Sequence, residues 1–339
     1  MKMKKVARKL THWALRAAVP HRWTVRRGRR RLLHLGICLN HRISRFSPFL
    51  RVAGDEFVAM ELGEALSRHC PEIGSWQLYD AKEAPTIVAD LVIVLWPDYP
   101  PLPRTCARKI MWLQNGGWSA LIPRFQEQFA VVFCASQLLC ERFPGLIYLP
   151  IACTNCTLYR PVAADPRFDV DVCFIGNYSE GRSGEHAARY MLPATRVRLA
   201  IWGSGWERAE PAILRRFARG RLPVKFGPVA HSSCRVFLSY HTQPQRQDDM
   251  PSGRLFDALA CEAFVLSDRM PSLDLLDRYV VFTSGGDDLR DKLDHYLTHP
   301  EERLAKARGA QAFVLEEHTN AHRAKELARV LGLPWIDQA

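Results

Sequence analysis

The sequence predicts an α/β protein with two domains, each built on a parallel sheet, and a separate basic arm at the N-terminus. The chain has 339 residues, which is too long for one ordinary hydrophobic core and suits two domains. Short apolar runs with Pro or Gly at their boundaries alternate with helical segments along the chain. This alternation is typical of parallel sheets that helices cover on both faces.

The composition is that of a folded protein with one unusual segment. Hydrophobic residues make up 47% of the chain and charged residues 24%. No apolar run approaches the roughly 20 residues that span a bilayer. The formal net charge of +12 is concentrated in residues 1–54, which contain 15 Lys or Arg and no Asp or Glu. The remaining chain has 32 basic and 35 acidic residues, so the basic character belongs to the N-terminal segment alone.

Residues 1–30 form the predicted arm, and their pattern indicates an amphipathic helix followed by a basic run. Apolar residues recur there at helical spacing: Val6, Leu10, Trp13 and Ala17. Pro20 ends this pattern before the arginines of residues 26–31. Such a segment suits contact with an anionic membrane through residues 1–31, and the alternative is a solvated tail. We expect no nucleic-acid partner and no secretion, because neither a nucleic-acid-binding module nor the apolar core of a signal peptide is present.

The ten cysteines do not form a metal-binding or disulfide pattern. Several lie in apolar stretches, where a free cysteine behaves as a small hydrophobic residue. Cys153-Thr-Asn-Cys156 is the only C-x-x-C pair, and it lacks the second Cys or His pair of a zinc site. The sequence therefore predicts no metal site. It favours a reducing, cytoplasmic location, at the inner membrane face if the arm binds there.

The first half of the chain shows a regular series of predicted strands and helices. A strand is predicted over 31–39, followed by a loop and a helix from about 55 to 69. Four more short apolar runs end at turn residues and are predicted as strands: 90–96, 109–113, 130–134 and 146–149. Pro161, Pro166 and neighbouring aspartates mark a hinge-like connection near 155–168, where we expect the domain boundary.

The segment 249–268 combines a small-residue loop, a helix start and a short buried strand. The small residues at 251–253 can bring backbone N–H groups close to an anion at a helix N-terminus, and Arg254 adds a cation there. Asp249 and Asp257, eight residues apart, place two carboxylates beside the same loop. The carboxyl end of the following strand would face the ligand crevice of an open α/β sheet. This combination suits a sugar nucleotide.

Residues 257–268, Asp-Ala-Leu-Ala-Cys-Glu-Ala-Phe-Val-Leu-Ser-Asp, resemble the donor-binding element of GT-B glycosyltransferases, most closely the CgeB-type group named after a spore-maturation protein. In the wider group-1 glycosyltransferases, two glutamates stand where this chain has Asp249 and Asp257, and a glycine stands in place of Glu262. Five further segments resemble parts of the second domain in the family's order: 171–177, 198–206, 224–229, 234–240 and 318–331. We expect 224–229 to be the third strand of that domain.

The resemblance implies a GT-B fold, in which two Rossmann-like domains face each other across a cleft. Residues 31–158 would then form the acceptor domain, residues 159–317 the donor domain, and residues 318–339 a closing helix. It further implies a glycosyltransferase that moves a sugar from a nucleotide-sugar donor to a glycan, lipid-linked saccharide or protein acceptor. Positive side chains and backbone amides can stabilise the departing diphosphate, so we expect neither a metal nor a separate cofactor.

The C-terminal half contains the residues expected to bind the donor. By resemblance, Asp257 binds the nucleotide ribose. Arg254 and Arg182 are candidates for binding the diphosphate. Arg189 or Lys225 could take the place of Arg182. The remaining candidates are Asp249 for sugar hydroxyls and, in loops and at strand ends, Asn177, Gly203, Gly205, His241, Pro251, Ser252 and Gly253. Each also has a structural explanation, such as a helix-start aspartate, a glycine turn or a hydrogen-bonding histidine.

The catalytic base and the acceptor side have weaker signals. Asp55 opens a predicted helix that faces the cleft; an inverting transfer needs such a base, and helix N-capping explains the residue equally well. Gln114, Asn115 and Trp118 lie in a polar and aromatic loop whose composition suits sugar stacking and hydroxyl recognition. Trp112, just before this loop, can equally be a core residue.

Three other interpretations remain to be compared with this one. A sugar-nucleotide epimerase would share the donor half without needing a roomy acceptor face. A catalytically inactive nucleotide- or glycan-binding subunit, held at the membrane by residues 1–31, is compatible with the aspartates that replace both family glutamates. An NAD-dependent dehydrogenase is disfavoured, because neither half contains a G-x-G-x-x-G turn with the acidic residue that should follow it.

Overall fold

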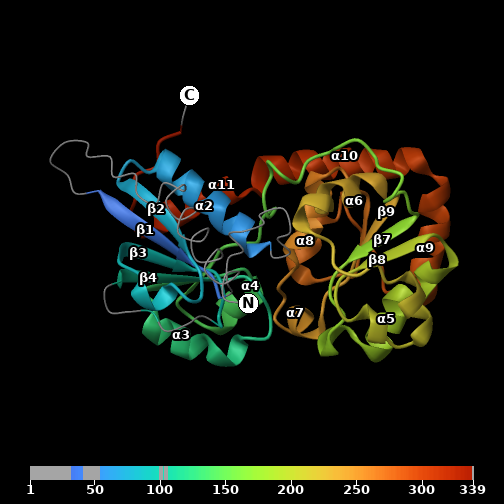
Figure 1. Cartoon of the computed structure of the whole chain (residues 1–339), viewed down its shortest axis with the longest axis horizontal. Coiled ribbons are helices and arrows are strands. Elements are labelled where there is room, and N and C mark those ends of the chain that lie inside the picture. Colours follow the sequence, from blue (N-terminus) through green and yellow to red (C-terminus); the bar gives the residue numbers. More distant parts are fainter. Residues whose placement is uncertain (1–31, 41–53, 99–101, 103–105, 338–339) are drawn as a thin grey trace, which may run out of the picture.

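The structure, a computed structural model, describes residues 32–40, 54–98, 102 and 106–337. Two parallel sheets lie side by side along the long axis of the molecule, each with helices packed around it (Figure 1). The N-terminal sheet is coloured blue to green and the C-terminal sheet green to orange in that view. The prediction of two α/β domains with parallel sheets is therefore confirmed. The basic arm, residues 1–31, lies outside the described residues.

The N-terminal domain contains a six-stranded sheet of strand order β2-β1-β3-β4-β5-β6, in which all neighbouring strands are parallel. Its strands are β1 (Leu33–Cys38), β2 (Ile73–Tyr79), β3 (Ala89–Val94), β4 (Cys106–Leu113), β5 (Val131–Cys134) and β6 (Leu146–Tyr148). Its helices are α2 (Asp55–His69), α3 (Ile122–Gln128) and α4 (Gln137–Arg142). Five strands match predicted runs. The edge strand β2 does not, because its middle residues are only half-buried and form no continuous apolar run.

Alternate residues of the central strands pack on opposite faces of this sheet, as the pleat of a strand requires. Leu35 and Ile37 of β1 and Ile93 of β3 lie in the core that α2 covers. Cys38 and Val94 lie in the core on the other face, which α3 covers. Both faces are therefore buried, which explains why these strands appear in the sequence as continuous apolar runs.

The C-terminal domain contains a five-stranded parallel sheet of order β11-β10-β9-β7-β8. Its strands are β7 (Val172–Ile175), β8 (Leu199–Trp202), β9 (Val236–Ser239), β10 (Val265–Ser267) and β11 (Val281–Phe282). Its helices are α5 (Gly184–Met191), α6 (Gly227–Ser233), α7 (Gln243–Gln247), α8 (Gly253–Ala260), α9 (Gly286–Thr298) and α10 (Pro300–Glu317).

The predicted strand at 224–229 is wrong. Residues Val224–Phe226 form one turn of 3-10 helix, and α6 begins at Gly227. Pro228 lies in the first turn of α6, where its missing N–H leaves no hydrogen bond unmade and its fixed φ suits a helix. The same missing N–H would interrupt the ladder of a central strand. This proline, rather than the apolar pattern, decides the local structure.

Helix α11 (Asn320–Leu331) returns from the C-terminal domain and packs on α2 of the N-terminal domain (Figure 1). Leu327 and Leu331 share one hydrophobic core with Leu62 and Leu66 of α2. The chain therefore crosses between the domains twice, after β6 and again before α11. Among the described residues, no helix combines the length and apolar character that a membrane span requires.

Candidate active site

A cavity of about 370 Å³ lies between the two domains. The turns after β7 and β8 and the start of α8 line it from the C-terminal domain, and the start of α2 and the loop after β4 line it from the N-terminal domain. Ligands of open α/β sheets usually bind at this position, outside the carboxyl ends of the strands. The volume lies within the range of roughly 300–1,000 Å³ that is usual for small-molecule sites.

Two glycine turns line the C-terminal side of the cavity. Gly176 and Asn177 follow β7, and Gly203 and Ser204 follow β8. Gly203 has a φ of +145°, and a Cβ there would overlap the carbonyl oxygen of Gly176. The Asn177 side-chain oxygen accepts a hydrogen bond from Ser204 N at 2.9 Å. Gly205 lies outside the lining, and its φ of +88° shapes the same turn. The close approach of the two turns requires glycine at position 203.

The small-residue loop at the start of α8 borders the cavity. Ser252, Gly253, Arg254 and Asp257 line it, whereas Pro251 is buried outside the lining. The apolar residues of α8 pack into the C-terminal core. Because α8 turns once in 3.6 residues, the residues at 254 and 257 then lie on the same cavity side of the helix.

Asp257 is only 2% exposed, and the linker between the domains holds its carboxylate. Oδ1 accepts a hydrogen bond from Thr154 N at 2.6 Å, and Oδ2 accepts one from Thr154 Oγ1 at 2.9 Å. Burial raises the pKa of Asp257 to about 7, although the hydrogen bonds from Thr154 and the charge of Arg254 act in the opposite direction. Burial likewise lowers the pKa of Arg254, which the charge of Asp257 opposes.

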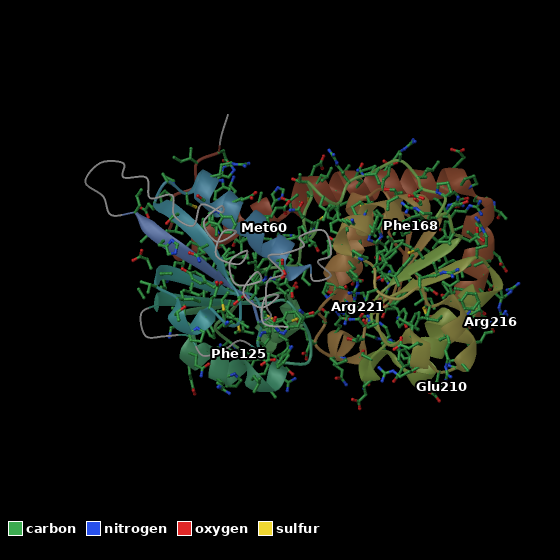
Figure 2. The ribbon with its side chains drawn as sticks, viewed as in Figure 1. Met60, Phe125, Phe168, Glu210, Arg216 and Arg221 are labelled. Atoms are coloured by element: carbon green, nitrogen blue, oxygen red, sulfur yellow. The ribbon has the colours of Figure 1, made fainter. Side chains whose placement is uncertain are left out.

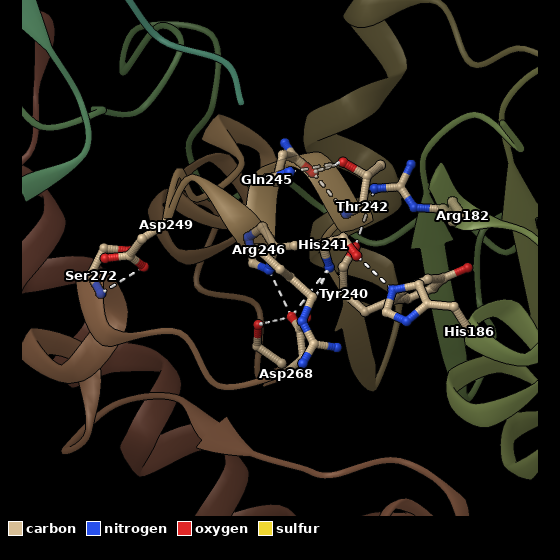
Figure 3. Close-up of polar contacts among 11 residues, drawn as sticks. Arg182, His186, Tyr240, His241, Thr242, Gln245, Arg246, Asp249, Asp268 and Ser272 are labelled. Carbon is tan, nitrogen blue, oxygen red and sulfur yellow. Dashed lines mark hydrogen bonds and ion pairs between the residues drawn. The ribbon is translucent and has the colours of Figure 1, made fainter. Parts of the chain in front are cut away.

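Arg182, a predicted phosphate ligand, lies beneath the turn after β7 instead of in the cavity lining. It is 3% exposed and donates to the carbonyl oxygen of Asn177 at 3.0 Å. It also donates to the carbonyl oxygen of Tyr240 at 3.2 Å (Figure 3). Its guanidinium also lies 5.4 Å from the ring centre of Phe174 and 5.3 Å from that of Tyr240. Burial lowers the pKa of Arg182 to about 10. In this place the arginine supports the turn that reaches the cavity.

His241 and Asp249, two further donor candidates, also lie outside the lining. His241 is fully buried, and its Nδ1 lies 2.6 Å from Asp268 Oδ1 (Figure 3). Burial alone would raise the pKa of Asp268, but the charge and hydrogen bonds of His241 lower it. Asp249 is buried, has a φ of +49°, and accepts a hydrogen bond from Ser272 N at 3.1 Å. His241 thus joins the end of β9, and Asp249 the loop that follows α7, to the segment after β10.

Asp55 lines the cavity from the N-terminal domain. The N-cap of α2 is Gly54, and Asp55 is the first residue of the helix, so the capping interpretation of Asp55 is wrong. The helix dipole favours an acidic side chain in the first turn of a helix, which explains a carboxylate at this position. Its charge reaches across the cavity, because Asp55 is one of the groups that raise the pKa of Arg254.

The loop after β4 divides into residues that face the cavity and residues that do not. Gln114 and Asn115 line the cavity. Trp112 is fully buried in the core and donates from Nε1 to the carbonyl oxygen of Leu149 at 3.0 Å. Trp118 packs against the N-terminal core and lies outside the lining. The amide residues, rather than the tryptophans, are therefore placed to meet a ligand.

Residues 150–156 form what we call the linker junction, a dense polar contact with α2, α8 and α11. Arg323 donates from Nε and Nη2 to two linker carbonyls at 2.7 and 3.1 Å. Asn320 Nδ2 lies 2.9 and 3.0 Å from two further linker carbonyls and 3.0 Å from Glu61 Oε2. Glu61 Oε1 accepts from the Cys156 amide at 2.8 Å. The linker is therefore fixed from three helices at once.

A second contact between the domains, the loop junction, joins Gly116 and Gly117 to residues 244–250. Gly117 N donates to Asp248 Oδ2 at 2.6 Å. A Cβ on Gly116 would overlap the backbone at the start of α7, so only glycine allows this approach. Met250 is fully buried in the N-terminal core, although its backbone continues into α8 of the C-terminal domain.

The cavity lining also contains residues that the sequence did not single out: Thr154, Tyr159, Trp202, Arg221, His231 and Gln245. Arg221 donates from Nε to Ser204 Oγ at 2.7 Å, and its side chain lies on the cleft side of the C-terminal domain (Figure 2). Of these residues, only Arg221 could have been suspected from the sequence. It belongs to the stretch 211–247, which has basic residues and no acidic ones and therefore suits an anionic ligand. The others are brought to the cavity by tertiary packing.

Comparisons with known proteins agree with this architecture. A family model described as "Glycosyl transferase-like" matches residues 184–329. Sucrose-phosphate synthase from Thermosynechococcus elongatus is similar in structure, with a TM-score of 0.61 and 14% identity over 88% of this chain and 98% of that chain. AviGT4, a glycosyltransferase involved in avilamycin A biosynthesis, has a TM-score of 0.58 and 15% identity over 90% and 100% of the two chains.

An alpha-glucosyltransferase solved with UDP-glucose and DNA containing an abasic site is also similar, with a TM-score of 0.60 and 10% identity over 88% of this chain and 99% of that chain. A search of curated proteins returned no match. The two parallel sheets with their surrounding helices therefore form the GT-B fold of these glycosyltransferases. The fold that the sequence resemblance implied is confirmed.

Proposed function

We propose that this chain is a glycosyltransferase of the CgeB-type group, which moves a sugar from a nucleotide-sugar donor to a glycan, lipid-linked saccharide or protein acceptor. The observation that carries the proposal is the cavity between the domains, with a cation, a carboxylate and glycine turns on its C-terminal wall and amide and carboxylate side chains on its N-terminal wall. The first wall suits a diphosphate and a ribose, and the second suits sugar hydroxyls.

The C-terminal wall is the proposed donor site. Arg254 and the backbone N–H groups at the glycine turns and at the start of α8 are suited to diphosphate oxygens. Asp257 would accept a hydrogen bond from a ribose hydroxyl, because a carboxylate has about four lone-pair sites and Thr154 occupies two of them. Arg182 and His241 would hold the loops that carry these groups without touching the donor.

The N-terminal wall would bind the acceptor. Asp55 is the one carboxylate that the described part of this domain contributes to the cavity lining. In an inverting transfer, Asp55 would take the proton of the acceptor hydroxyl while that oxygen bonds to the anomeric carbon and the bond to the diphosphate breaks. Arg254 would stabilise the charge on the departing diphosphate. Gln114 and Asn115, which line the cavity, would hold the acceptor hydroxyls near the reacting carbon.

We propose that the transfer needs no metal. Among the described residues, His295, His299 and Glu302 are the one group of potential ligands close enough together to hold an ion. They are exposed where α9 ends and α10 begins, outside the cavity lining. The charge of Arg254 and the backbone amides would act on the diphosphate instead. We further propose a cytoplasmic protein that residues 1–31 hold at an anionic membrane surface.

Nucleotide binding is the first test. Titration calorimetry of the full chain with UDP, GDP, ADP, CDP and dTDP is expected to show that one of them binds clearly more tightly. Arg254→Met should weaken that binding by roughly 10- to 100-fold, because a charge-assisted hydrogen bond contributes about 1.5–3 kcal/mol. Arg216→Met is the matched control, an exposed arginine of the same domain (Figure 2), and should leave affinity unchanged. If none of the five nucleotides binds, the proposed function is wrong.

Turnover is the second test. The nucleotide sugar that corresponds to the bound nucleotide should release its nucleoside diphosphate at the same rate with and without EDTA, and Asp55→Asn should slow transfer to an acceptor. Nucleotide binding without any release of nucleoside diphosphate would instead favour an inactive binding subunit. Loss of turnover in EDTA would contradict the proposed metal independence.

A further inference from the structure

The cavity wall contains a buried histidine for which the proposed donor site has no role so far. His231 belongs to α6, lines the cavity, and is only 2% exposed. Neither ring nitrogen has a hydrogen-bond partner among the described residues, and Nδ1 is completely buried, so Nε2 is the nitrogen that a ligand in the cavity can reach. Polar side-chain atoms inside proteins are nearly always paired, so an unpaired histidine in a cavity wall points to a partner that the cavity receives.

The protonation state of His231 restricts the kind of partner. Burial and, to a lesser extent, the positive charge of Arg254 lower the pKa of His231 to about 3. The ring is therefore neutral at physiological pH, with a proton on one nitrogen and a lone pair on the other. A neutral ring nitrogen suits an uncharged heterocycle that offers an N–H or a carbonyl, whereas the cationic Arg254 in the same lining suits a phosphate.

The ring of His231 is held in one orientation. Phe237 packs against it edge to face, with ring centres 4.5 Å apart and an angle of 77°. Tyr159 lies on another side, with its ring centre 6.0 Å away. Gly227, one helical turn earlier, leaves room for Tyr159, because a Cβ there would lie 2.9 Å from the tyrosine hydroxyl oxygen. A ring fixed by its neighbours can recognise a ligand edge with little loss of side-chain freedom.

Apolar side chains of the C-terminal domain line the cavity together with His231. Leu222, Pro223 and Val224 precede α6 in the chain, and Trp202 ends β8. A nucleobase is the planar part of a nucleotide sugar, with apolar faces and a polar edge. It fits a site of apolar side chains with one fixed polar atom, as small-molecule sites commonly have.

We propose that His231 recognises the base of the donor nucleotide through one hydrogen bond between its ring Nε2 and the base edge. The inference rests on the proposed function, because it requires a nucleotide in the cavity. It makes His231 a residue that determines which nucleotide binds, while the diphosphate and ribose are held by other groups. Its substitution should therefore change base preference and leave the binding of the diphosphate alone unchanged.

The experiment compares nucleotides with inorganic pyrophosphate, which has no base. His231→Phe keeps a planar ring and removes the hydrogen bond, and His231→Gln places an amide atom near the Nε2 position. For the nucleotide that the wild type prefers, His231→Phe should lose about tenfold in affinity, and its preference over the other four nucleotides should shrink by the same factor. Its affinity for pyrophosphate should stay unchanged. His231→Gln should restore part of the preference, and His295→Gln, at an exposed histidine of α9, is the control that should change nothing.

The outcomes separate this inference from the proposed function. If the wild type binds a nucleotide and His231→Phe weakens nucleotides and pyrophosphate equally, or weakens neither, His231 does not recognise the base, although the proposed function stands. If the wild type binds no nucleotide, both fail. Should His231→Phe not fold, the comparison of His231→Gln with His231→Asn decides, because only glutamine places its amide near the Nε2 position. Equal base preference in these two variants would overturn the inference.

Discussion

Within the part of the chain that the structure describes, the two domains meet at two junctions of different construction. In the linker junction, residues 150–156, Arg323 and Asn320 of α11 donate hydrogen bonds to the linker, and Asp257 of α8 accepts hydrogen bonds from it. The loop junction is held by close backbone packing at Gly116, one hydrogen bond between Gly117 and Asp248, and the buried side chain of Met250. One junction depends mainly on polar pairing and the other mainly on shape.

This difference indicates how the cavity can be both stable and accessible. Opening the linker junction would leave several buried donors and acceptors unpaired, and each such group costs about 1–3 kcal/mol. Opening the loop junction would break one hydrogen bond to a charged group and expose one methionine side chain, at a lower total cost. We therefore expect the domains to separate at the loop junction and to pivot at the linker junction, which keeps Thr154 beside Asp257 in both states.

Substitution of Arg323 should have the largest effect. Arg323→Ala removes a 6% exposed side chain that donates to three carbonyl oxygens and whose pKa burial lowers to about 10. We expect it to reduce the free energy of unfolding by about 4 kcal/mol, because the carbonyls remain buried without partners. Urea denaturation measures this. Arg329→Ala, on the same helix but 70% exposed at its side chain, should change stability by less than about 0.5 kcal/mol. Equal effects would show that the linker junction is not held by polar pairing.

Met250→Ala tests the loop junction and should be the next largest. Met250 is fully buried in the N-terminal core beside Met111 and Leu113, and truncation of a buried methionine costs about 3 kcal/mol through the cavity that it leaves. The same change should increase the radius of gyration in small-angle scattering, because the loop junction loses its anchor. Met250→Leu keeps the volume and should cost less than about 1.5 kcal/mol. An unchanged radius of gyration would mean that Met250 does not hold the domains together.

The contrast between the junctions also explains which parts of the molecule the sequence could predict. Both sheets were predictable because their central strands are buried on both faces and so leave continuous apolar runs. Strand β2 was not predicted, because an edge strand with half-buried residues has no such run. The segment 224–229 was wrongly predicted as a strand, because its apolar pattern fits both a strand and a helix. Only Pro228 distinguishes the two structures there.

The candidate site was predictable where its residues follow one another in the chain. Arg254 and Asp257 lie one helical turn apart in α8, so local spacing places both at the cavity. Thr154 and His231 reach the same cavity from the linker and from α6, and no local pattern marks them. Arg182 and His241 were predicted as ligands because both follow strand ends. In the structure both are buried, and Arg182 binds backbone carbonyls whereas His241 binds the carboxylate of Asp268. Tertiary packing brings these partners together, so the local sequence does not reveal them.

The pH dependence of stability should reveal the acid buried in the linker junction. Burial raises the pKa of Asp257 from 3.8 to about 7, so the folded protein binds this proton more tightly than the unfolded chain. The ionisation of Asp257 therefore destabilises the fold above about pH 7, and this cost falls as the pH drops from 7 to about 4. Relative to Asp257→Asn, the wild type should gain about 2–3 kcal/mol of stability between pH 8 and pH 5. Urea denaturation of both proteins at several pH values measures this difference, in which other titrating groups largely cancel. A difference that does not depend on pH would show that Asp257 is ionised in both states.

Of these substitutions, Asp248→Ala should have the smallest effect on global stability, and its effect should be confined to the loop junction. It removes the acceptor of the Gly117 amide at the loop junction, which should reduce the free energy of local opening by about 1 kcal/mol. Hydrogen exchange at the Gly117 amide should then become about fivefold faster, since 1 kcal/mol corresponds to that factor at 25 °C. Asp248→Asn keeps a side-chain oxygen and should retain most of the protection. The Thr154 amide, which donates to Asp257 in the linker junction, should exchange at its original rate. If both amides become equally faster, the junctions open together, and the pivot does not lie at the linker.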